Sequence, residues 1–329
     1  MPSFRPDLNA DMLIKKRSPD RSRLGVAPEL PLPHIAVCIC TYRRPLLLRR
    51  LLQDLMNQQT DGLFSFSIVV ADNDAAQSAE PLIAEIRSKC QFDIAYCVES
   101  RQNIALARNK VVQNAEGDYL AFIDDDEFPS PRWLLTLFTA LQDYSVDGVL
   151  GPVLRHFDET PPGWLEKSKL YVRRVNPTGM RVEWREARTG NVLLRHEVIG
   201  DDSTPFRQEF RSGEDQDFFR RKIQEGCIFI WCAEAEVFEV VPPARWNRSY
   251  LLRKALLQGA TAGCQTDTRG ILKSMVAVAL YIPALPFAFL AGQHRAIPLL
   301  VSLCNHLGKL LIVIGVNPVH GGYVLDGPE

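Results

Sequence analysis

Short apolar runs alternate with amphipathic segments through the first half of the chain. Uninterrupted apolar runs of this length are typical of strands buried on both faces of a parallel sheet. Apolar positions spaced three and four residues apart predict helices between them. The predicted elements are strand 34–40, helix 46–56, strand 64–71, helix 81–89, strand 92–98, helix 101–114, strand 119–123 and a helix from 133. This alternation predicts an α/β fold with a Rossmann-like, mostly parallel sheet flanked by helices.

The second half is less regular. Residues 156–186 are rich in Pro, Gly and Trp and predict irregular structure. Around them the pattern predicts strands 149–154, 189–195 and 227–231, helices 218–225 and 245–259, and an apolar segment 237–243. At the other end of the chain, residues 1–33 are polar and rich in Pro, with no apolar core of the kind that signal peptides have. We expect a flexible or loosely packed arm there.

Two apolar runs close the chain, at 275–291 and 297–316, and each approaches the length that spans a bilayer. Pro283, Pro286 and Lys309 weaken an interpretation as two full spans. A helical hairpin that dips into one leaflet or lies in the interface fits better, and a pair of buried helices covering the sheet is the alternative. Basic residues precede the runs, as expected near anionic lipid: Arg245, Arg248, Arg253, Lys254, Arg269 and Lys273.

Composition narrows the class of protein. The chain has 329 residues and a formal net charge of −1, whereas nucleic-acid binders usually carry a strongly basic face. Nucleic acid is therefore not an expected partner. The eight cysteines form no CxxC pair and no zinc-type Cys/His spacing. Reduced, buried thiols in the cytoplasm are the favoured interpretation.

Four consecutive acids, Asp124 to Glu127, directly follow the predicted strand 119–123. Ligands of open α/β sheets bind at the carboxyl ends of the strands. Four carboxylates there repel one another unless a cation lies among them, and their oxygens suit Mg²⁺ or Mn²⁺. A solvated acidic turn is the alternative. Because the chain has neither a GxGxxG nor a GxxxxGK[ST] motif, we expect any phosphate to be bound through the metal.

Four segments, in this order, resemble the family 2 glycosyltransferases of the GT-A fold: residues 37–45, 69–74, 117–127 and 213–218. The resemblance covers residues 35–259. Segments 101–109 and 241–245 add a likeness to bacterial exopolysaccharide enzymes of the succinoglycan glucosyltransferase type. The resemblance implies a glycosyltransferase domain at 34–260, with a nucleotide-binding half at 34–127 and an acceptor half at 128–260. Residues 261–329 would form the membrane-associated helical region.

The resemblance also implies roles for single residues. Asp126 is the expected metal ligand and Asp215 the catalytic base. In the segment of Asp215, Asp217 is a candidate for helix capping. The expected nucleotide-sugar contacts are Thr41, Tyr42, Arg43, Asp72, Asp74, Arg108, Asp124 and Asp125. Among these, Asp72 would accept the imide N–H of uracil, and Arg108 would approach the diphosphate, hold the acids or form a structural ion pair. The expected acceptor contacts are Gly190, Asn191, Glu214 and Trp164.

The implied reaction moves one sugar from a nucleotide sugar, a UDP-hexose, to a glycan acceptor that is lipid-linked, with inversion at the anomeric carbon. Processive relatives carry Gln-x-x-Arg-Trp, whereas Pro242 replaces that Gln here, which favours a non-processive enzyme. Such an enzyme would serve cell-surface polysaccharide synthesis at the cytoplasmic face of the inner membrane. The alternatives are a sugar nucleotidyltransferase, disfavoured because the loop 41–45 has no Gly, and a catalytically silent scaffold that binds glycan or nucleotide.

Overall fold

The computed structural model of the chain describes residues 12–16, 31–210, 213–263 and 266–316. It divides into two compact units. The first contains residues 1–154 and 173–239, and the second contains residues 155–172 and 240–329. The predicted boundary between residues 260 and 261 stays a prediction, and it lies within helix α7, Arg248–Gly263.

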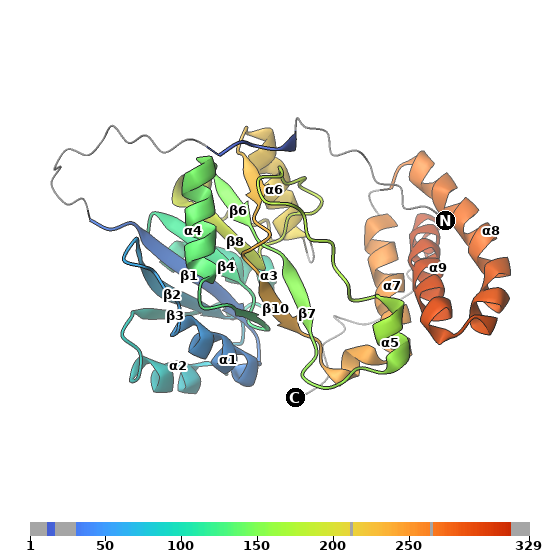
Figure 1. Cartoon of the computed structure of the whole chain (residues 1–329), viewed down its shortest axis with the longest axis horizontal. Coiled ribbons are helices and arrows are strands. Elements are labelled where there is room, and N and C mark those ends of the chain that lie inside the picture. Colours follow the sequence, from blue (N-terminus) through green and yellow to red (C-terminus); the bar gives the residue numbers. More distant parts are fainter. Residues whose placement is uncertain (1–11, 17–30, 211–212, 264–265, 317–329) are drawn as a thin grey trace. The chain divides into compact units, whose positions relative to one another are not determined.

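A seven-stranded sheet forms the centre of the first unit (Figure 1). Its strand order is β3-β2-β1-β4-β8-β6-β9. All neighbours are parallel except β8, which runs antiparallel to β4 and β6. The strands are β1 His34–Thr41, β2 Ser65–Asp72, β3 Ile94–Val98, β4 Tyr119–Ile123, β6 Gly148–Leu150, β8 Asn191–Arg195 and β9 Phe229–Trp231. The predicted Rossmann-like, mostly parallel sheet is confirmed.

Helices cover both faces of this sheet. Strand β1 shows why, since its side chains alternate between two buried clusters: Ile35 and Val37 face one, and Ala36 and Cys38 face the other. Apolar residues of three helices complete the first cluster, and those of two helices complete the second. The helices are α1 Pro45–Leu55, α2 Glu80–Arg87 and α4 Trp133–Tyr144 on one face, and α3 Ile104–Asn114 and α6 Glu214–Gln224 on the other.

The predicted strand 149–154 is wrong, because the chain breaks there into two strands, β6 and β7 (Val153–His156). Pro152 has no N–H for a continuous ladder, and the N–H of Gly151 bonds to the carbonyl of Asn191 instead. A short strand β5, Glu127–Pro129, was not predicted either. It pairs antiparallel with β10 (Val237–Val240) in a second sheet of order β5-β10-β7. The acid run therefore leads from one sheet into another.

Part of the predicted N-terminal arm is bonded to the first unit. Leu13 forms an antiparallel bridge with Met180. The N–H of Ile14 donates to the carbonyl of Gly179 at 2.9 Å. Residues 1–11 and 17–30 of the predicted arm lie outside the described residues. For residues 12–16, the expectation of a loose arm gives way to strand-like pairing.

The second unit is helical. Its helices are α5 Gly163–Ser168, α7 Arg248–Gly263, α8 Thr268–Leu290 and α9 Gln293–Val313, and the short 3₁₀ helix η4, Pro243–Trp246, precedes α7. Helices α7 and α9 pack closely because glycines line the contact. A Cβ added at Gly259 would lie 2.0 Å from the carbonyl oxygen of Asn305, and one at Gly308 would lie 2.2 Å from that of Leu256. Helices α8 and α9 are consecutive and contact each other through Ser274 and His306, whose side chains lie 3.1 Å apart, so the predicted hairpin is confirmed.

Helix α8 presents an apolar surface with little cover. Pro283 and Pro286 lie inside it and do not end it. By length and composition, α8 and α9 are able to cross a membrane, and only 6% of the most apolar window of α8 is buried. Large exposed side chains on α8 include Leu272, Met275, Val276, Leu280, Ile282, Phe287, Phe289 and Leu290. An apolar surface of this kind is typical of a contact with lipid or with another protein.

Candidate functional site

The site begins where two neighbouring parallel strands end. Strand β1 ends at Thr41 and β4 at Ile123, and the two strands are paired. The chain builds β2 and β3 on one side of β1 and then returns to place β4 on the other side. This reversal of strand order leaves a crevice at the carboxyl ends, which is where ligands of such sheets bind. The acid run therefore lies at the expected edge.

Asp125 faces the loop that follows β1. The hydroxyl of Thr41 donates to its carboxylate at 2.7 Å, and Arg44 lies 3.2 Å from it. The same guanidinium lies 3.4 Å from Asp126. Burial and the neighbouring charge of Asp126 raise the pKa of Asp125. Arg44, which was not among the predicted site residues, thus neutralises two of the four acids. Asp126, the predicted metal ligand, is one of them.

The other two acids face a cavity of about 460 Å³. The cavity brings together two predicted residues far apart in sequence, Asp124 and Asp215. The predicted residues that line it are Arg108, Asp124, Gly190, Asn191 and Asp215, and those that do not are Thr41, Tyr42, Arg43, Asp72, Asp74, Asp125, Asp126, Glu214 and Trp164. Pockets of this volume are typical of small-molecule sites.

Glu127 and Glu239 add two carboxylates to the cavity. They lie directly opposite one another in the antiparallel pair of β5 and β10, where like charges repel. Burial and the charges of Asp124 and Asp126 raise the pKa of Glu127 well above its usual range. Carboxylates held this close by the fold fit a hard cation by their chemistry. Within the described ranges, however, no three acidic, His or Cys side chains already stand close enough to hold one.

Arg108 is the buried cation of the site. Its guanidinium forms an ion pair with Glu214 and lies 3.7 Å from the half-exposed Asp124. Burial lowers its pKa, but the carboxylates of Glu214 and Asp124 outweigh burial, and the net shift is upward. The predicted roles of holding the acids and of forming a structural ion pair therefore coincide in one side chain. Glu214, a predicted acceptor contact, is 4% exposed, and one of its carboxylate oxygens accepts a hydrogen bond from Arg108.

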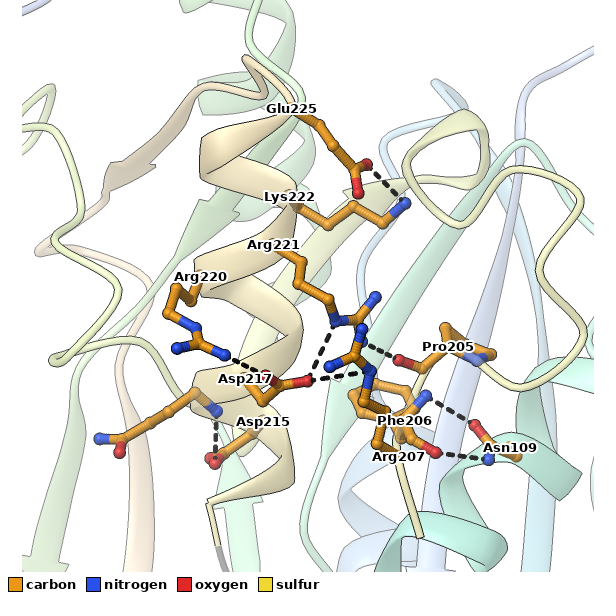
Figure 2. A network of polar contacts seen from close by, with 11 residues as sticks. Asn109, Pro205, Phe206, Arg207, Asp215, Asp217, Arg220, Arg221, Lys222 and Glu225 are labelled. Carbon is orange, nitrogen blue, oxygen red and sulfur yellow. Dashed lines mark hydrogen bonds and ion pairs between the residues drawn. The ribbon is translucent and has the colours of Figure 1, made fainter. Parts of the chain in front are cut away.

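The first turn of α6 separates two acids with different surroundings (Figure 2). Asp217 is buried among arginines, at 2.8 Å from Arg220 and 3.0 Å from Arg221, with Arg207 at 3.7 Å. Asp215 lines the cavity and accepts a hydrogen bond from the N–H of Gln216. Asp217 was predicted to cap α6, but this helix has no side-chain cap among the described residues. The carboxylate of Asp217 forms ion pairs with the arginines instead. Asp215 remains available to a ligand.

The acids at the carboxyl end of β2, Asp72 and Asp74, are already bound within the protein. Asp72 is fully buried and accepts from the N–H groups of Asp74 and Ala79 and from the hydroxyl of Tyr96. The carboxylate of Asp74 forms two hydrogen bonds with Arg43, a residue with a left-handed φ of 54°. Strained backbone of this kind is often found in functional loops. A uracil contact at Asp72 would have to replace one of these bonds.

The predicted acceptor residues differ in what they contact. A Cβ added at Gly190 would lie 2.6 Å from Oε1 of Glu127, so Gly190 lets the backbone approach the acids. The side-chain amide of Asn191 donates to two backbone carbonyls and accepts from the indole of Trp133 at 2.8 Å, which makes it a support of the site. Trp164 belongs to the second unit, where Arg248 lies over its ring. Its acceptor contact stays a prediction.

Several residues of the candidate site were not predicted as contacts. Arg44 stood in the basic loop 41–45, and Glu127 in the acid run, so a signal for both was present in the sequence. The sequence carried no such signal for Glu239, because only the pairing of β10 with β5 brings this residue to the cavity. The remaining unpredicted polar residues that line the cavity are Arg173, Arg174, Asn176, Glu186, Arg188 and Thr189.

Comparison with solved structures supports the fold. A mannosyltransferase of Pyrobaculum calidifontis, PcManGT, solved with GDP-Man and Mn²⁺, is similar with a TM-score of 0.58 and 14% identity, over 85% of this chain and 87% of that one. S. aureus TarS 1-349, solved with UDP, is similar with a TM-score of 0.50 and 16% identity, over 89% and 95% of the two chains. The predicted GT-A fold is confirmed.

Sequence comparison is more specific. The profile of Glycosyl transferase family 2 matches residues 36–208, more than half of the chain. The succinoglycan biosynthesis protein ExoM of Rhizobium meliloti (strain 1021) is 34% identical over 232 residues, 70% of this chain and 74% of ExoM. The hyaluronan synthase of Pasteurella multocida is 29% identical, and the match spans 27% of that longer protein. This chain is therefore a glycosyltransferase that belongs to family 2.

Proposed function

We propose that the chain transfers one sugar from a nucleotide sugar, a UDP-hexose, to a glycan acceptor in polysaccharide biosynthesis. The observation that carries the proposal is the cavity shared by Asp124, at the end of β4, and Asp215, on α6. The cavity brings together acids suited to hold the metal ion of the donor and a carboxylate suited to take a proton from the acceptor. The succinoglycan protein ExoM, a relative at 34% identity, supports the pathway class.

Asp215 is the proposed general base. Its place in the lining of the cavity allows it to take the proton from an acceptor hydroxyl as that oxygen attacks the anomeric carbon. A single displacement inverts the anomeric centre, so an α-linked donor gives a β-linked product. Asp217 is excluded from this role because three arginines surround its buried carboxylate.

The departing nucleoside diphosphate gathers negative charge. When bound, Mg²⁺ or Mn²⁺ would neutralise that charge. Asp126 is the proposed ligand, with Arg44 as the group that now neutralises it. Asp124 and Glu127, which face the cavity, are the other acids suited to hold the ion. Arg108 keeps Asp124 near its position through the contact at 3.7 Å.

The nucleotide is proposed to lie along the ends of β1 and β2. Thr41, Tyr42 and Arg43 would contact it from the loop after β1, and Asp72 or Asp74 would recognise the base. The side chain of Arg43 is 61% exposed, although its partner Asp74 is buried at 5% exposed, so Arg43 is the member of this pair that a nucleotide can reach. This would place the nucleotide-binding half within residues 34–127 and the acceptor half within residues 128–260.

The exposed apolar surface of α8 supports membrane association, proposed here for the cytoplasmic face of the inner membrane. A family member that modifies a lipid-linked glycan meets its acceptor at that surface. The basic residues on α7 and at the start of α8 suit anionic headgroups. Pro242, in place of the Gln of processive enzymes, supports the addition of one sugar per acceptor.

The test is a donor screen with the purified chain, Mn²⁺ and a lipid-linked acceptor extract. We expect the highest transfer from a UDP-hexose, a mass increase of one sugar, and a β-linked product by NMR. No transfer from any nucleotide sugar would contradict the proposed reaction. A product of retained α-configuration would contradict the single displacement at Asp215.

A further inference from the structure

One side of the cavity is built by the segment 173–189. Six of its residues line the cavity: Arg173, Arg174, Asn176, Glu186, Arg188 and Thr189. The proposed reaction uses none of them, since the acids for metal and base come from β4, β5 and α6. Residues of this kind beside a reaction centre are candidates for recognising a part of the substrate that does not react.

Three residues that line this cavity each carry a buried polar atom without a hydrogen-bond partner among the described residues. The atoms are the hydroxyl oxygen of Thr189, the side-chain carbonyl of Asn176 and the indole N–H of Trp231. Thr189 is 1% exposed and Asn176 is 6% exposed. Most buried polar groups are paired, because an unpaired one loses its bonds to water. Two donors and an acceptor are the partners that the hydroxyls of a sugar ring need.

Segment 173–189 also carries two arginines whose positive charge is not balanced by an ion pair with a described residue. Arg173 is paired with Glu239 at 3.4 Å. Arg174 and Arg188 form no ion pair with any residue in the described part of the chain, and Arg188 donates only to backbone carbonyls. Glu186, the acid nearest to them in sequence, accepts from an amide instead. A guanidinium group that keeps N–H donors outside any ion pair is suited to carboxylate or phosphate.

We propose that this side of the cavity is an acceptor subsite for a glycan that carries an anionic group. Thr189, Asn176 and Trp231 bind hydroxyls of the acceptor, and Arg174 and Arg188 bind the anion. The inference rests on the proposed function, because it takes the cavity as the place of transfer. The anion is either a sugar carboxylate or the diphosphate that joins a glycan to lipid, and both offer oxygens to the same guanidinium groups.

The test measures binding by calorimetry with the full-length chain in detergent. The probes are cellobiose, cellobiouronic acid and cellobiose linked to decyl diphosphate, each added after UDP and Mn²⁺. We expect one anionic probe to bind about ten-fold or more tightly than cellobiose, and its identity names the source of the anion. The advantage should disappear in Arg188→Gln and in Arg174→Gln and persist in Arg132→Gln, a surface control. Thr189→Val should weaken all three probes alike.

Equal binding of the three probes by the unaltered chain would overturn the proposal, as would an advantage that survives both arginine substitutions. Unchanged affinity of Thr189→Val for every probe would overturn the placement of the sugar. UDP affinity, measured separately, should not change in Arg188→Gln. If it falls, the arginines serve the donor diphosphate and the acceptor subsite is wrong. If the unaltered chain binds UDP-sugars but transfers nothing, the proposed function fails while the glycan affinities still decide the inference.

Discussion

Residues of one type have different tasks in this site, and their surroundings decide which. Asp215 and Asp217 lie two positions apart on α6, yet only Asp215 lines the cavity. Asp217 is 2% exposed at its side chain and is held by arginines (Figure 2). The family resemblance implied a chemical role for Asp215, and Asp217 was a candidate for helix capping. The helical spacing of Arg220 and Arg221 from Asp217 is visible in the sequence, whereas Arg207 reaches Asp217 only through the fold.

Replacing Asp217 by Asn should reduce stability. The substitution leaves the arginines around position 217 without their shared carboxylate, and we expect a loss of about 1–3 kcal/mol in the free energy of unfolding. The measurement is the melting temperature of the purified chain. Glu225→Gln at the C-cap of the same helix is the matched control, because the side chain of Glu225 is 54% exposed in its pair with Lys222 and the substitution should change stability by less than about 0.5 kcal/mol. Equal melting temperatures for both variants would refute the anchoring role.

Gly190 should tolerate no side chain. A methyl group there would lie 2.6 Å from Glu127 and 3.1 Å from Asp124, so these carboxylates must move. We expect Gly190→Ala to lower kcat/KM about ten- to a hundred-fold, with the fold retained by circular dichroism. Gly163→Ala, where a Cβ meets nothing within 4 Å, is the control and should keep full activity. Full activity in Gly190→Ala would show that the position of these acids does not matter.

Secondary-structure elements were predicted best where the pattern was strong and local. The apolar runs of β1 and β4 identified these central strands because both are buried on their two faces. The break at Gly151 and Pro152 was missed, since an apolar run does not reveal which hydrogen bonds continue. The pairing of β5 with β10 was also missed, and with it Glu239. Contacts between distant strands depend on the whole topology. The acid run 124–127 was therefore predictable from the sequence, whereas the arginines of segment 173–189 that line the cavity were not.

At this scale the contact of α7 with α9 is testable. Because a Cβ at Gly259 would overlap the backbone of Asn305, Gly259→Ala should force the two helices apart at a cost of about 1–3 kcal/mol. Limited proteolysis in detergent should then cleave the helical unit faster than in the unaltered chain. Ala262→Ser, at an exposed position of the same helix, is the control. Identical digestion rates for all three proteins would contradict the close packing.

On the scale of the whole molecule, the chain combines a glycosyltransferase unit with a helical unit that exposes apolar side chains. We expect the full-length protein to float with vesicles that contain anionic lipid. Replacing Leu272, Leu280, Phe287 and Leu290 by Gln should abolish flotation, because each buried apolar side chain contributes about 1.5–3 kcal/mol. All four are more than half exposed, so the fold should survive.

The matched control replaces four exposed apolar residues elsewhere by Gln: Leu32, Leu46, Leu63 and Val172. That variant should float like the unaltered chain. If both variants lose flotation equally, the apolar surface of α8 has no special role. If the unaltered chain stays in the soluble fraction, the proposed membrane association is wrong.

The central claim is that Asp215 removes the proton of an acceptor while the strand-end acids serve the donor. Sugar transfer and UDP binding should be measured side by side for the unaltered chain and for Asp215→Asn, with Mn²⁺ present. The account predicts unchanged UDP affinity and transfer reduced by about 10²- to 10⁴-fold. Undiminished transfer in Asp215→Asn would contradict it.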